Sequence, residues 1–307
     1  MLWEGTIPSH DGTLLYVRKR IPSNVRAVIQ MAHGMTEHGG VYDEFIDALV
    51  AAGFAVYIHD HRGHGKTALE EDLGHLEPKL GWNHAVQDII FLSEHIREEV
   101  DAPLFLLGHS MGSFLSRRVV QLRDDLYDGL LLSGTGASPG LLGKLGEIVA
   151  KFEMTVRGKR TKSPLLNHLS FGSFNAHFKP AATESDWLSS DPQQVQRYMN
   201  DPLCGFICTT SFYKELFSGV AQATSKAGMM QTPTTLPIYL FSGDRDPVGD
   251  MGKGVQQSYN LYRKCGVQDV TIKLYKDGRH EMFHEVNRQD VFQDVIHWLH
   301  AHIRKNE

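Results

Sequence analysis

Residues 104–112 read Leu-Phe-Leu-Leu-Gly-His-Ser-Met-Gly, and this stretch decides how the rest of the chain is interpreted. Four apolar residues lead directly into the pentapeptide 108–112, which has the form G-x-S-x-G. An apolar run this short is typical of a strand buried on both faces of a parallel sheet. The residues that follow place apolar side chains at helical spacing, namely Phe114, Leu115, Val119 and Leu122. The sequence therefore predicts a sharp strand-to-helix turn with Ser110 at its tip.

A turn of this kind holds a serine hydroxyl clear of the sheet, in a strained backbone conformation. Gly108 and Gly112 lack the β-carbons that would block a tight turn between closely packed elements. Ser110 is therefore a candidate nucleophile.

Strand and helix patterns alternate along the chain on both sides of this turn. Helical spacing separates the predicted strands, and a last amphipathic helix follows them. The two predicted antiparallel strands are 2–7 and 14–21, and the buried strands besides the one before Ser110 are 27–32, 54–58, 130–133, 237–242 and 270–275. This alternation predicts an α/β fold with a mostly parallel central sheet and helices on both faces.

The alternation stops between residues 138 and 236, where apolar residues take helical spacing and aromatic residues are frequent. We predict a helical cap at 138–236, inserted into an α/β core made of 1–137 and 237–307. One predicted cap helix carries a stripe of apolar residues: Leu141, Leu142, Leu145, Ile148, Val149 and Phe152. We expect this stripe to line the mouth of the site and hold an acyl chain, with packing on the core as the alternative.

A serine hydroxyl becomes a good nucleophile only when a base takes its proton and an acid orients that base. Both partners should follow strand ends later in the chain, the acid before the histidine. We assign Asp246, after the strand at 237–242, as the acid and His280, after the strand at 270–275, as the base. Asp244 is a rival acid, although its place suits support of the turn, and Asp250 suits the cap of the next helix. His284, one helical turn beyond His280, is the alternative base.

The oxyanion that forms when a serine attacks a carbonyl group needs two backbone N–H donors. One should be the N–H of Met111, the residue after the nucleophile, and the other that of Met35, after the strand at 27–32. The alternative is that His33 and Gly34 form only a strand-end turn.

Two strings could instead indicate zinc. Residues 280–284 match H-E-x-x-H, in which two histidines on one helix bind the metal. Here, however, the string follows a strand and a turn, and no third ligand is evident. Residues 59–64 approach the H-x-H-x-D-H pattern of binuclear zinc hydrolases, but Gly63 replaces its aspartate. We therefore predict no metal, and we interpret His59, His61 and His64 as hydrogen-bonding loop residues.

Composition limits the partners and the compartment. The formal net charge of −5 disfavours nucleic acid, and the apolar runs are far shorter than a membrane span. Glu4, His10 and Asp11 interrupt the N-terminus, which therefore lacks a signal core. The three cysteines are odd in number and lack metal-type spacing, so we expect reduced thiols in a cytoplasmic protein: Cys204, Cys208 and Cys265.

The motifs taken together resemble the monoacylglycerol lipase and lysophospholipase branch of the α/β-hydrolases, often described with serine aminopeptidases. The resemblance covers nearly the whole chain and is carried by residues 33–38, 59–65, 108–112, 244–249 and 278–281. It implies a cofactor-free ester hydrolase that acts on small acyl glycerides or similar lipid esters, with Met35 and Met111 as the oxyanion hole. The cap could also contact a membrane surface transiently.

Two other functions stay open at this point. An aminopeptidase would need a carboxylate pair in the cap to hold the substrate amine, for which Glu184 and Asp186 are the candidates. A binding module without catalysis is the other alternative, although Ser110, Asp246 and His280 occur in the order that catalysis requires.

Overall fold

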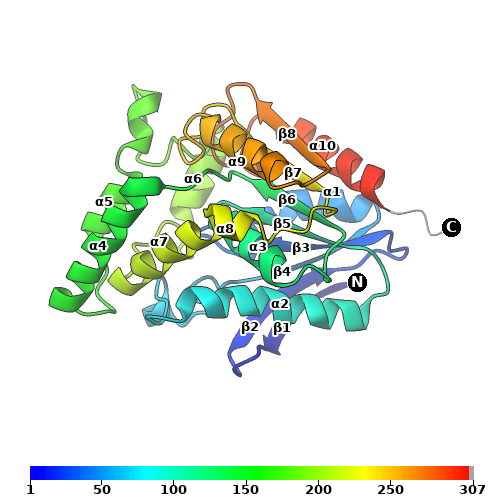
Figure 1. The fold of residues 1–307 in the computed structure, drawn as a ribbon, viewed down its shortest axis with the longest axis horizontal. Coiled ribbons are helices and arrows are strands. Elements are labelled where there is room, and N and C mark those ends of the chain that lie inside the picture. Colours follow the sequence, from blue (N-terminus) through cyan, green and yellow to red (C-terminus); the bar gives the residue numbers. More distant parts are fainter. Residues whose placement is uncertain (304–307) are drawn as a thin grey trace.

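The computed structural model describes residues 1–303, which form one eight-stranded sheet with helices on both faces (Figure 1). The strand order is β1-β2-β4-β3-β5-β6-β7-β8, and all neighbours from β4 onwards pair in parallel. Only β1 with β2 and β2 with β4 are antiparallel. The strands are β1 (Leu2–Pro8), β2 (Leu14–Arg20), β3 (Ala27–Ala32), β4 (Phe54–His59), β5 (Leu104–His109), β6 (Gly129–Ser133), β7 (Ile238–Gly243) and β8 (Val270–Tyr275). The predicted α/β fold is confirmed, and the predicted strand limits agree within one or two residues.

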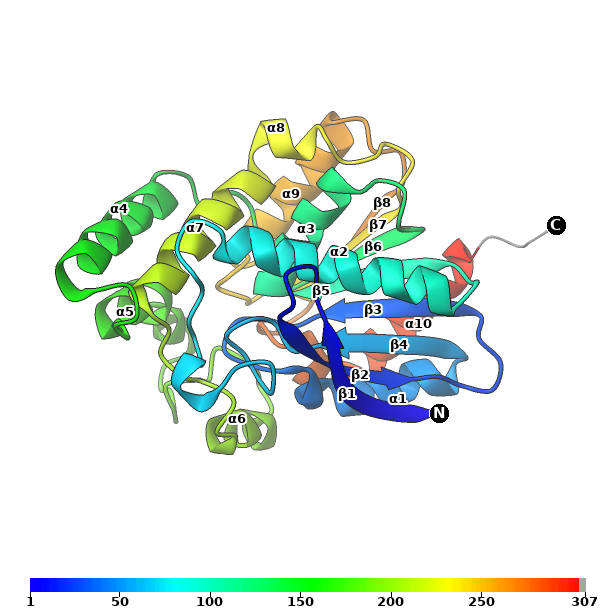
Figure 2. The ribbon, with the colours of Figure 1, turned by 90° about the horizontal axis from the view of Figure 1, so that it is seen from below.

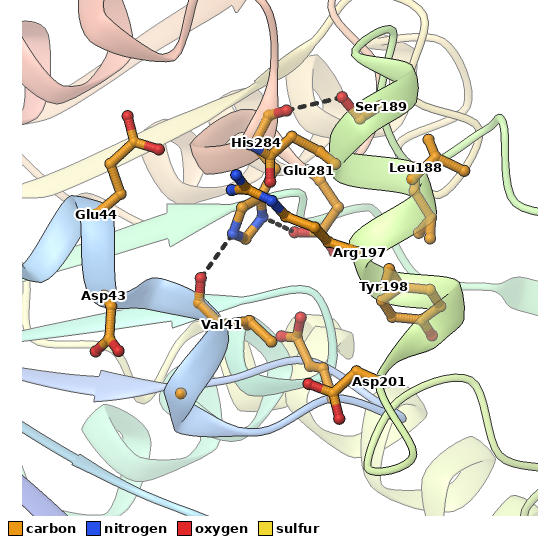
Figure 3. Close-up of a pocket in the computed structure, with 14 residues that line it drawn as sticks. Val41, Asp43, Glu44, Leu188, Ser189, Arg197, Tyr198, Asp201, Glu281 and His284 are labelled. Atoms are coloured by element: carbon orange, nitrogen blue, oxygen red, sulfur yellow. Dashed lines mark hydrogen bonds and ion pairs between the residues drawn. The ribbon is translucent and has the colours of Figure 1, made fainter.

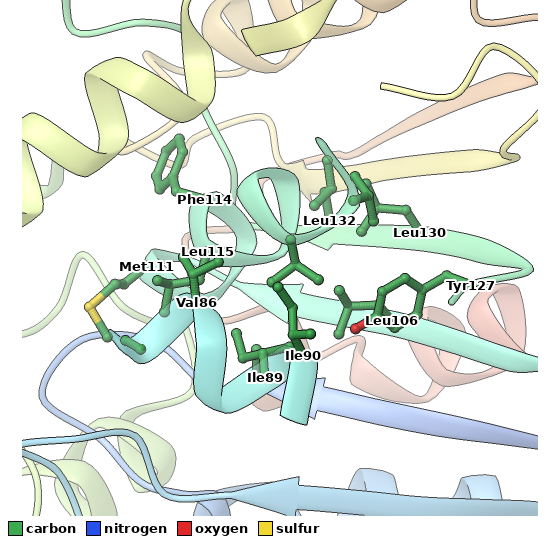
Figure 4. Close-up of a cluster of buried hydrophobic side chains, with 14 of the residues drawn as sticks. Val86, Ile89, Ile90, Leu106, Met111, Phe114, Leu115, Tyr127, Leu130 and Leu132 are labelled. Atoms are coloured by element: carbon green, nitrogen blue, oxygen red, sulfur yellow. The ribbon is translucent and has the colours of Figure 1, made fainter. Parts of the chain in front are cut away.

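The central strands are apolar on both faces because each face is covered by helices. Successive residues of β5 point to opposite sides: Leu104 and Leu106 join one buried cluster, and Phe105 and Leu107 join the other. The first cluster also contains side chains of α2 (Gly81–Glu99) and α3 (Met111–Leu122), some of which Figure 4 shows, and of α9 (Lys253–Lys264). The second contains side chains of α1 (Asp43–Ala51) and α10 (Arg288–His302), which lie on the opposite side of the sheet (Figure 2).

The segment between β6 and β7, residues 138–236, is helical and adds no strand to the described sheet. We call it the cap segment. Its helices are α4 (Gly140–Arg157), α5 (Pro164–Phe171), α6 (Pro192–Asn200), α7 (Thr210–Thr224) and α8 (Lys226–Met229), with a 3₁₀ turn at Phe174–Phe178. In Figure 1, α4 and α5 extend away from the sheet, whereas α7 and α8 run back over α3. Because α7 packs on α2 and α3, its Phe212 and Val220 belong to the core cluster. We keep 138–236 as a proposed cap on a core of 1–137 and 237–307.

The apolar stripe on α4 lines neither of the two cavities described below, and of its residues only Val149 packs on the core, which corrects our expectation. Five residues of the stripe are 58–80% exposed: Leu141, Leu142, Leu145, Ile148 and Phe152. Val156, on the same helix, is exposed as well. Only Val149 is partly buried. The buried face of α4 carries small residues instead, including Gly143 and Ala150, and it packs on α7. Gly146 lies against Phe217, whose ring would be only 3.0 Å from a β-carbon there. The close approach of the two helices therefore turns the large apolar side chains of α4 outward.

Candidate active site

Ser110 lies at the predicted turn between β5 and α3, with φ +49° and ψ −120°. A positive φ is costly for serine, so the surrounding structure must hold this conformation. A β-carbon at Gly108 would lie 2.4 Å from the Gly112 carbonyl oxygen, and one at Gly112 would lie 2.0 Å from the Ala32 carbonyl oxygen. The two glycines are therefore required by close backbone approach.

The structure brings Ser110, His280 and Asp246 into one hydrogen-bonded row. The Ser110 hydroxyl donates to His280 Nε2 over 2.9 Å, and His280 Nδ1–H donates to Asp246, with both carboxylate oxygens at 3.0 Å. Asp246 also accepts hydrogen bonds from the Ser242 hydroxyl at 2.7 Å and from the Val248 N–H at 2.8 Å. The three residues follow β5, β8 and β7, whose carboxyl ends meet at one edge of the sheet.

Electrostatics favour an ionised Asp246 and a basic His280. Burial disfavours both charged forms, but the two groups lie against each other and their attraction outweighs it. The pKa of Asp246 is therefore lowered below its ordinary value, and the pKa of His280 is raised. Asp246 is fully buried and His280 nearly so, which protects the pair from solvent screening.

The rival acids and the rival base lie outside this row. Asp244 accepts a hydrogen bond from the Asp277 N–H at 2.8 Å and so supports the turn. Asp250 does not cap the next helix as we expected: Gly252 is the N-cap of α9, because Asp250 already takes a positive φ of 49° in the preceding turn. His284 contacts the Val41 carbonyl oxygen and Glu281, not Ser110.

Met35 lines the same cavity as Ser110, and Met111 follows Ser110 directly in the chain. Met111 is the first residue of α3, where an N–H has no partner within its own helix. Within residues 1–303 neither N–H donates to another protein atom. Two such donors near a reactive hydroxyl can bind a negative oxygen.

A cavity of about 160 Å³ opens at Ser110, His280 and Met35. Its far wall comes from the cap segment and is largely aromatic, with Phe171, Trp187 and Phe206. The wall also includes Glu184, whereas the Asp186 carboxylate accepts hydrogen bonds within its own turn from Ala182 and Thr183. Glu184 and Asp186 therefore do not form a shared amine site in this arrangement.

A second, larger cavity of about 280 Å³ adjoins the first and does not contain Ser110 (Figure 3). The two cavities share Leu188, Tyr198 and Glu281 as lining residues. The lining of the second cavity is rich in polar groups; besides Glu281 it includes Glu37, Ser189, Gln194, Arg197, Asp201 and His284.

Behind the row lies a buried polar network that sequence reasoning missed. Glu281 accepts from His109 Nε2 over 3.0 Å, and it lies 3.2 Å from His284 Nδ1. Burial opposes its ionisation, yet His109 and His284 hold its pKa well below the ordinary value. Burial and the charge of Glu281 raise the pKa of the nearby Glu37, which accepts from the Tyr42 hydroxyl at 2.5 Å. The position of Glu281 directly after His280 was the available signal, but the H-E-x-x-H pattern drew it into the metal interpretation.

The histidines of the second zinc-like string form a buried cluster with His33. The His61 N–H donates to His33 Nε2 over 2.9 Å, and His61 Nδ1 lies 3.1 Å from His59 Nε2. His64 Nδ1 bonds to the Arg62 carbonyl oxygen at 2.9 Å. The interpretation of hydrogen-bonding loop residues therefore agrees with His61 and His64, whereas His59 is the last residue of β4 and not a loop residue.

Residues 23–287 match the family described as serine aminopeptidase, S33. The chain belongs to this family. It is an α/β-hydrolase and a serine hydrolase of the monoacylglycerol lipase-like type.

Two curated relatives and one solved structure show how far the similarity extends. The monoglyceride lipase of Mus musculus is 29% identical over 296 residues, covering 95% of this chain and 87% of the relative. The monoacylglycerol lipase of Mycolicibacterium smegmatis is 27% identical and covers 91% and 89%. A thermostable carboxyl esterase from Bacillus coagulans, solved with glycerol, has a TM-score of 0.91 at 27% identity and covers 99% of both chains.

None of the helices within residues 1–303 combines the length and the apolar composition that crossing a membrane requires. All three cysteines are free, with Cys204 and Cys208 buried.

Proposed function

We propose that this protein hydrolyses small lipid esters, of the monoacylglycerol or lysophospholipid type, through an acyl-enzyme formed on Ser110. The observation that carries the proposal is the row in which Ser110 lies 2.9 Å from His280 and His280 lies 3.0 Å from a buried Asp246. The names of the relatives, monoglyceride and monoacylglycerol lipases, support the substrate class.

In the first half of the reaction, the Ser110 oxygen attacks the ester carbonyl carbon while its proton passes to His280 Nε2. Asp246 stabilises the resulting imidazolium. The carbonyl oxygen becomes negative and accepts hydrogen bonds from the Met35 and Met111 N–H groups. The carbon–oxygen bond to the alcohol then breaks, and the alcohol leaves with the proton from His280.

In the second half, water attacks the acyl-serine and gives a proton to His280, and the proton returns to the Ser110 oxygen as the acid is released. No cofactor takes part in these steps. The atoms balance as one ester and one water consumed, with one alcohol and one carboxylic acid formed.

The cap side of the cavity at Ser110 offers apolar contacts to an ester substrate. The aromatic side chains of Phe171 and Phe206 would contact the acyl chain there. We therefore propose Phe171 and Phe206 as the chain-length determinants, whereas Leu145 and Ile148 of α4 are exposed and do not line this cavity.

Ser110→Ala tests the mechanism directly. We expect an intact fold and a kcat at least about 10⁴-fold lower, because the members of such a row act as a unit. A fluorophosphonate probe should label the natural protein and not the variant. Near-normal turnover by folded Ser110→Ala would contradict the proposal.

A substrate panel separates ester from amide chemistry. Glycerol monoesters with acyl chains from acetyl to octanoyl should be cleaved with rising kcat/KM, since each buried methylene contributes about 0.8 kcal/mol. Aminoacyl amides should react far more slowly. A preference for the amides, or a flat response to chain length, would favour the aminopeptidase alternative or a small-ester hydrolase.

We propose further that the exposed stripe of α4 contacts the lipid surface from which the substrate comes. An exposed row of large apolar side chains on one helix is typical of a helix that lies in a membrane interface. The polar side of the same helix carries Lys144 and Lys151, which could face lipid head groups.

A further inference from the structure

Residues 186–190 of the cap segment run directly alongside the loop that carries His280. We call these residues the strap. The His280 N–H donates to the Trp187 carbonyl oxygen at 3.4 Å, and the Glu281 N–H donates to the Leu188 carbonyl oxygen at 2.7 Å. The Ser189 hydroxyl donates to the His284 carbonyl oxygen at 2.8 Å. The strap is therefore hydrogen-bonded to the His280 loop over several residues.

A buried carboxylate and a partly buried guanidinium strengthen this attachment. The fully buried Glu285 carboxylate accepts from the Ser190 N–H at 3.0 Å and from the Arg279 N–H at 2.9 Å, and it also bonds to the Ser190 hydroxyl. The Arg279 guanidinium donates to the Ser189 carbonyl oxygen at 3.0 Å. Hydrogen bonds to charged groups are stronger than neutral ones, so the strap and the loop should behave as one unit.

Trp187 also packs on the imidazole itself. Its ring centroid lies 5.2 Å from that of His280 at an interplanar angle of 34°. Phe171 stacks on Trp187 at 5.8 Å and 12°, and the backbone N–H of Trp187 donates to Asn175 Oδ1 at 2.9 Å. The tryptophan is thus fixed on the cap side and contacts His280 on the other.

We propose that Trp187 is a positioning residue, through which the cap segment holds His280 in line with Ser110. The inference rests on the proposed function and adds a role for the cap beyond substrate binding. A 1 Å misplacement of a reacting group can cost roughly 100-fold in rate, so a loosened imidazole should lower kcat itself.

This role differs from that of a simple wall of the cavity. A wall residue acts through KM, and its effect grows with acyl length. A positioning residue lowers kcat by a similar factor for acetyl and octanoyl esters. It also alters the environment of His280, which a wall residue would leave unchanged.

The direction of the pH effect follows from the groups around His280. They are Asp246 after β7, Glu281 on its own loop, Glu37 after β3 and His109 at the end of β5. Removing the indole lets water reach the imidazole, while Asp246 stays fully buried and keeps its attraction. The imidazolium is then easier to form, so the acid limb of kcat/KM should move to higher pH.

The experiment compares Trp187→Ala, Trp187→Phe and Phe206→Ala, each with its melting curve. Phe206 is the matched control because it lines the same cavity and contacts no strap residue among the described aromatic pairs. Trp187→Ala should lower kcat about 10- to 100-fold for acetyl and octanoyl esters alike. It should also slow the fluorophosphonate labelling of Ser110 and move the acid limb of the kcat/KM profile to higher pH. Trp187→Phe should restore most of the rate. Phe206→Ala should raise KM for octanoyl esters without moving the limb.

The inference would be overturned if Trp187→Ala kept the kcat and the acid limb of the natural protein. It would also be overturned if the substitution changed only KM. Trp187→Leu is judged by the same criteria if the alanine variant does not melt cooperatively. Failure of the proposed function would look different, because Ser110→Ala would then retain activity in an otherwise natural chain.

Discussion

At the scale of single residues, the identity of the acid is the sharpest claim about the site. Asp246 and Asp244 are two positions apart on one turn, yet only Asp246 reaches His280. Asp246→Asn should lower kcat by roughly 10³- to 10⁴-fold, because an amide favours the wrong tautomer of the imidazole.

Asp244→Asn is the matched control for this change. Its side-chain oxygen can still accept from the Asp277 N–H, so we expect kcat within about threefold of the natural protein. Steady-state kinetics on one short ester measure both variants. Reversed effects would mean that the acid has been assigned to the wrong residue.

At the scale of elements, the α4 stripe should decide whether the protein binds a lipid surface. Leu142→Glu with Leu145→Glu places two charges on the exposed row, which we expect to lower the fraction bound to sedimented vesicles about tenfold or more. The kcat/KM for a soluble short ester should change less than about twofold, since neither residue lines the cavity at Ser110. Leu14→Glu, an exposed leucine on β2, is the matched control. If the natural protein, the double variant and the Leu14→Glu control all bind vesicles equally, the proposed membrane contact is contradicted.

The stripe also shows what the sequence could and could not predict. The strands and the turn at Ser110 were predictable because buried parallel strands have short apolar runs and because glycine spacing indicates the turn. The helix at α4 was predictable from its periodicity, but the direction of its apolar face was not. Helical spacing identifies a face without saying what covers it, and here Gly143, Gly146 and Ala150 form the buried side.

The three residues of the candidate site were predictable from their places after strands, but their contacts with distant segments were not. Ser110, Asp246 and His280 each follow a strand, so the fold alone brings them to one edge. The contact of Trp187 with His280 and that of Glu281 with His109 join segments far apart in the chain, and no local pattern indicates them.

At the scale of the whole molecule, the buried histidine cluster should make the fold sensitive to acid. Burial lowers the pKa of His33, His59 and His61, and it lowers that of His64 to about 4. Below about pH 6.5 the unfolded chain binds protons that these native side chains reject, so stability falls. His280 and His284 have raised pKa values, so their stabilisation is fully present below pH 6.5 and is lost only as the pH rises. Glu37, with its raised pKa, offsets part of the loss.

Urea unfolding at pH 7, 6 and 5 measures this dependence. The free energy of unfolding should fall as the pH drops from 6.5 to 5, with about 1.4 kcal/mol per pH unit for each proton taken up. His64→Asn keeps a donor for the Arg62 carbonyl oxygen but cannot titrate, so it should reduce the slope by about one proton. If the free energy of unfolding of the natural protein does not change between pH 7 and pH 5, the folded protein takes up these protons as readily as the unfolded chain, and the prediction is contradicted.

The order of strands in the sheet has a consequence for how this enzyme is made. β6 and β7 are neighbours, yet the cap segment separates them in the chain, with Ser110 before it and both Asp246 and His280 after it. During synthesis the N-terminal half emerges first, so the turn that bears the serine can form while its partners are still untranslated. Pairing parallel strands across so long an interval is intrinsically slow. A nascent or truncated chain that ends before β7 therefore carries Ser110 without Asp246 and His280, its proposed partners, and we expect it to become active only when β7 and β8 join the sheet.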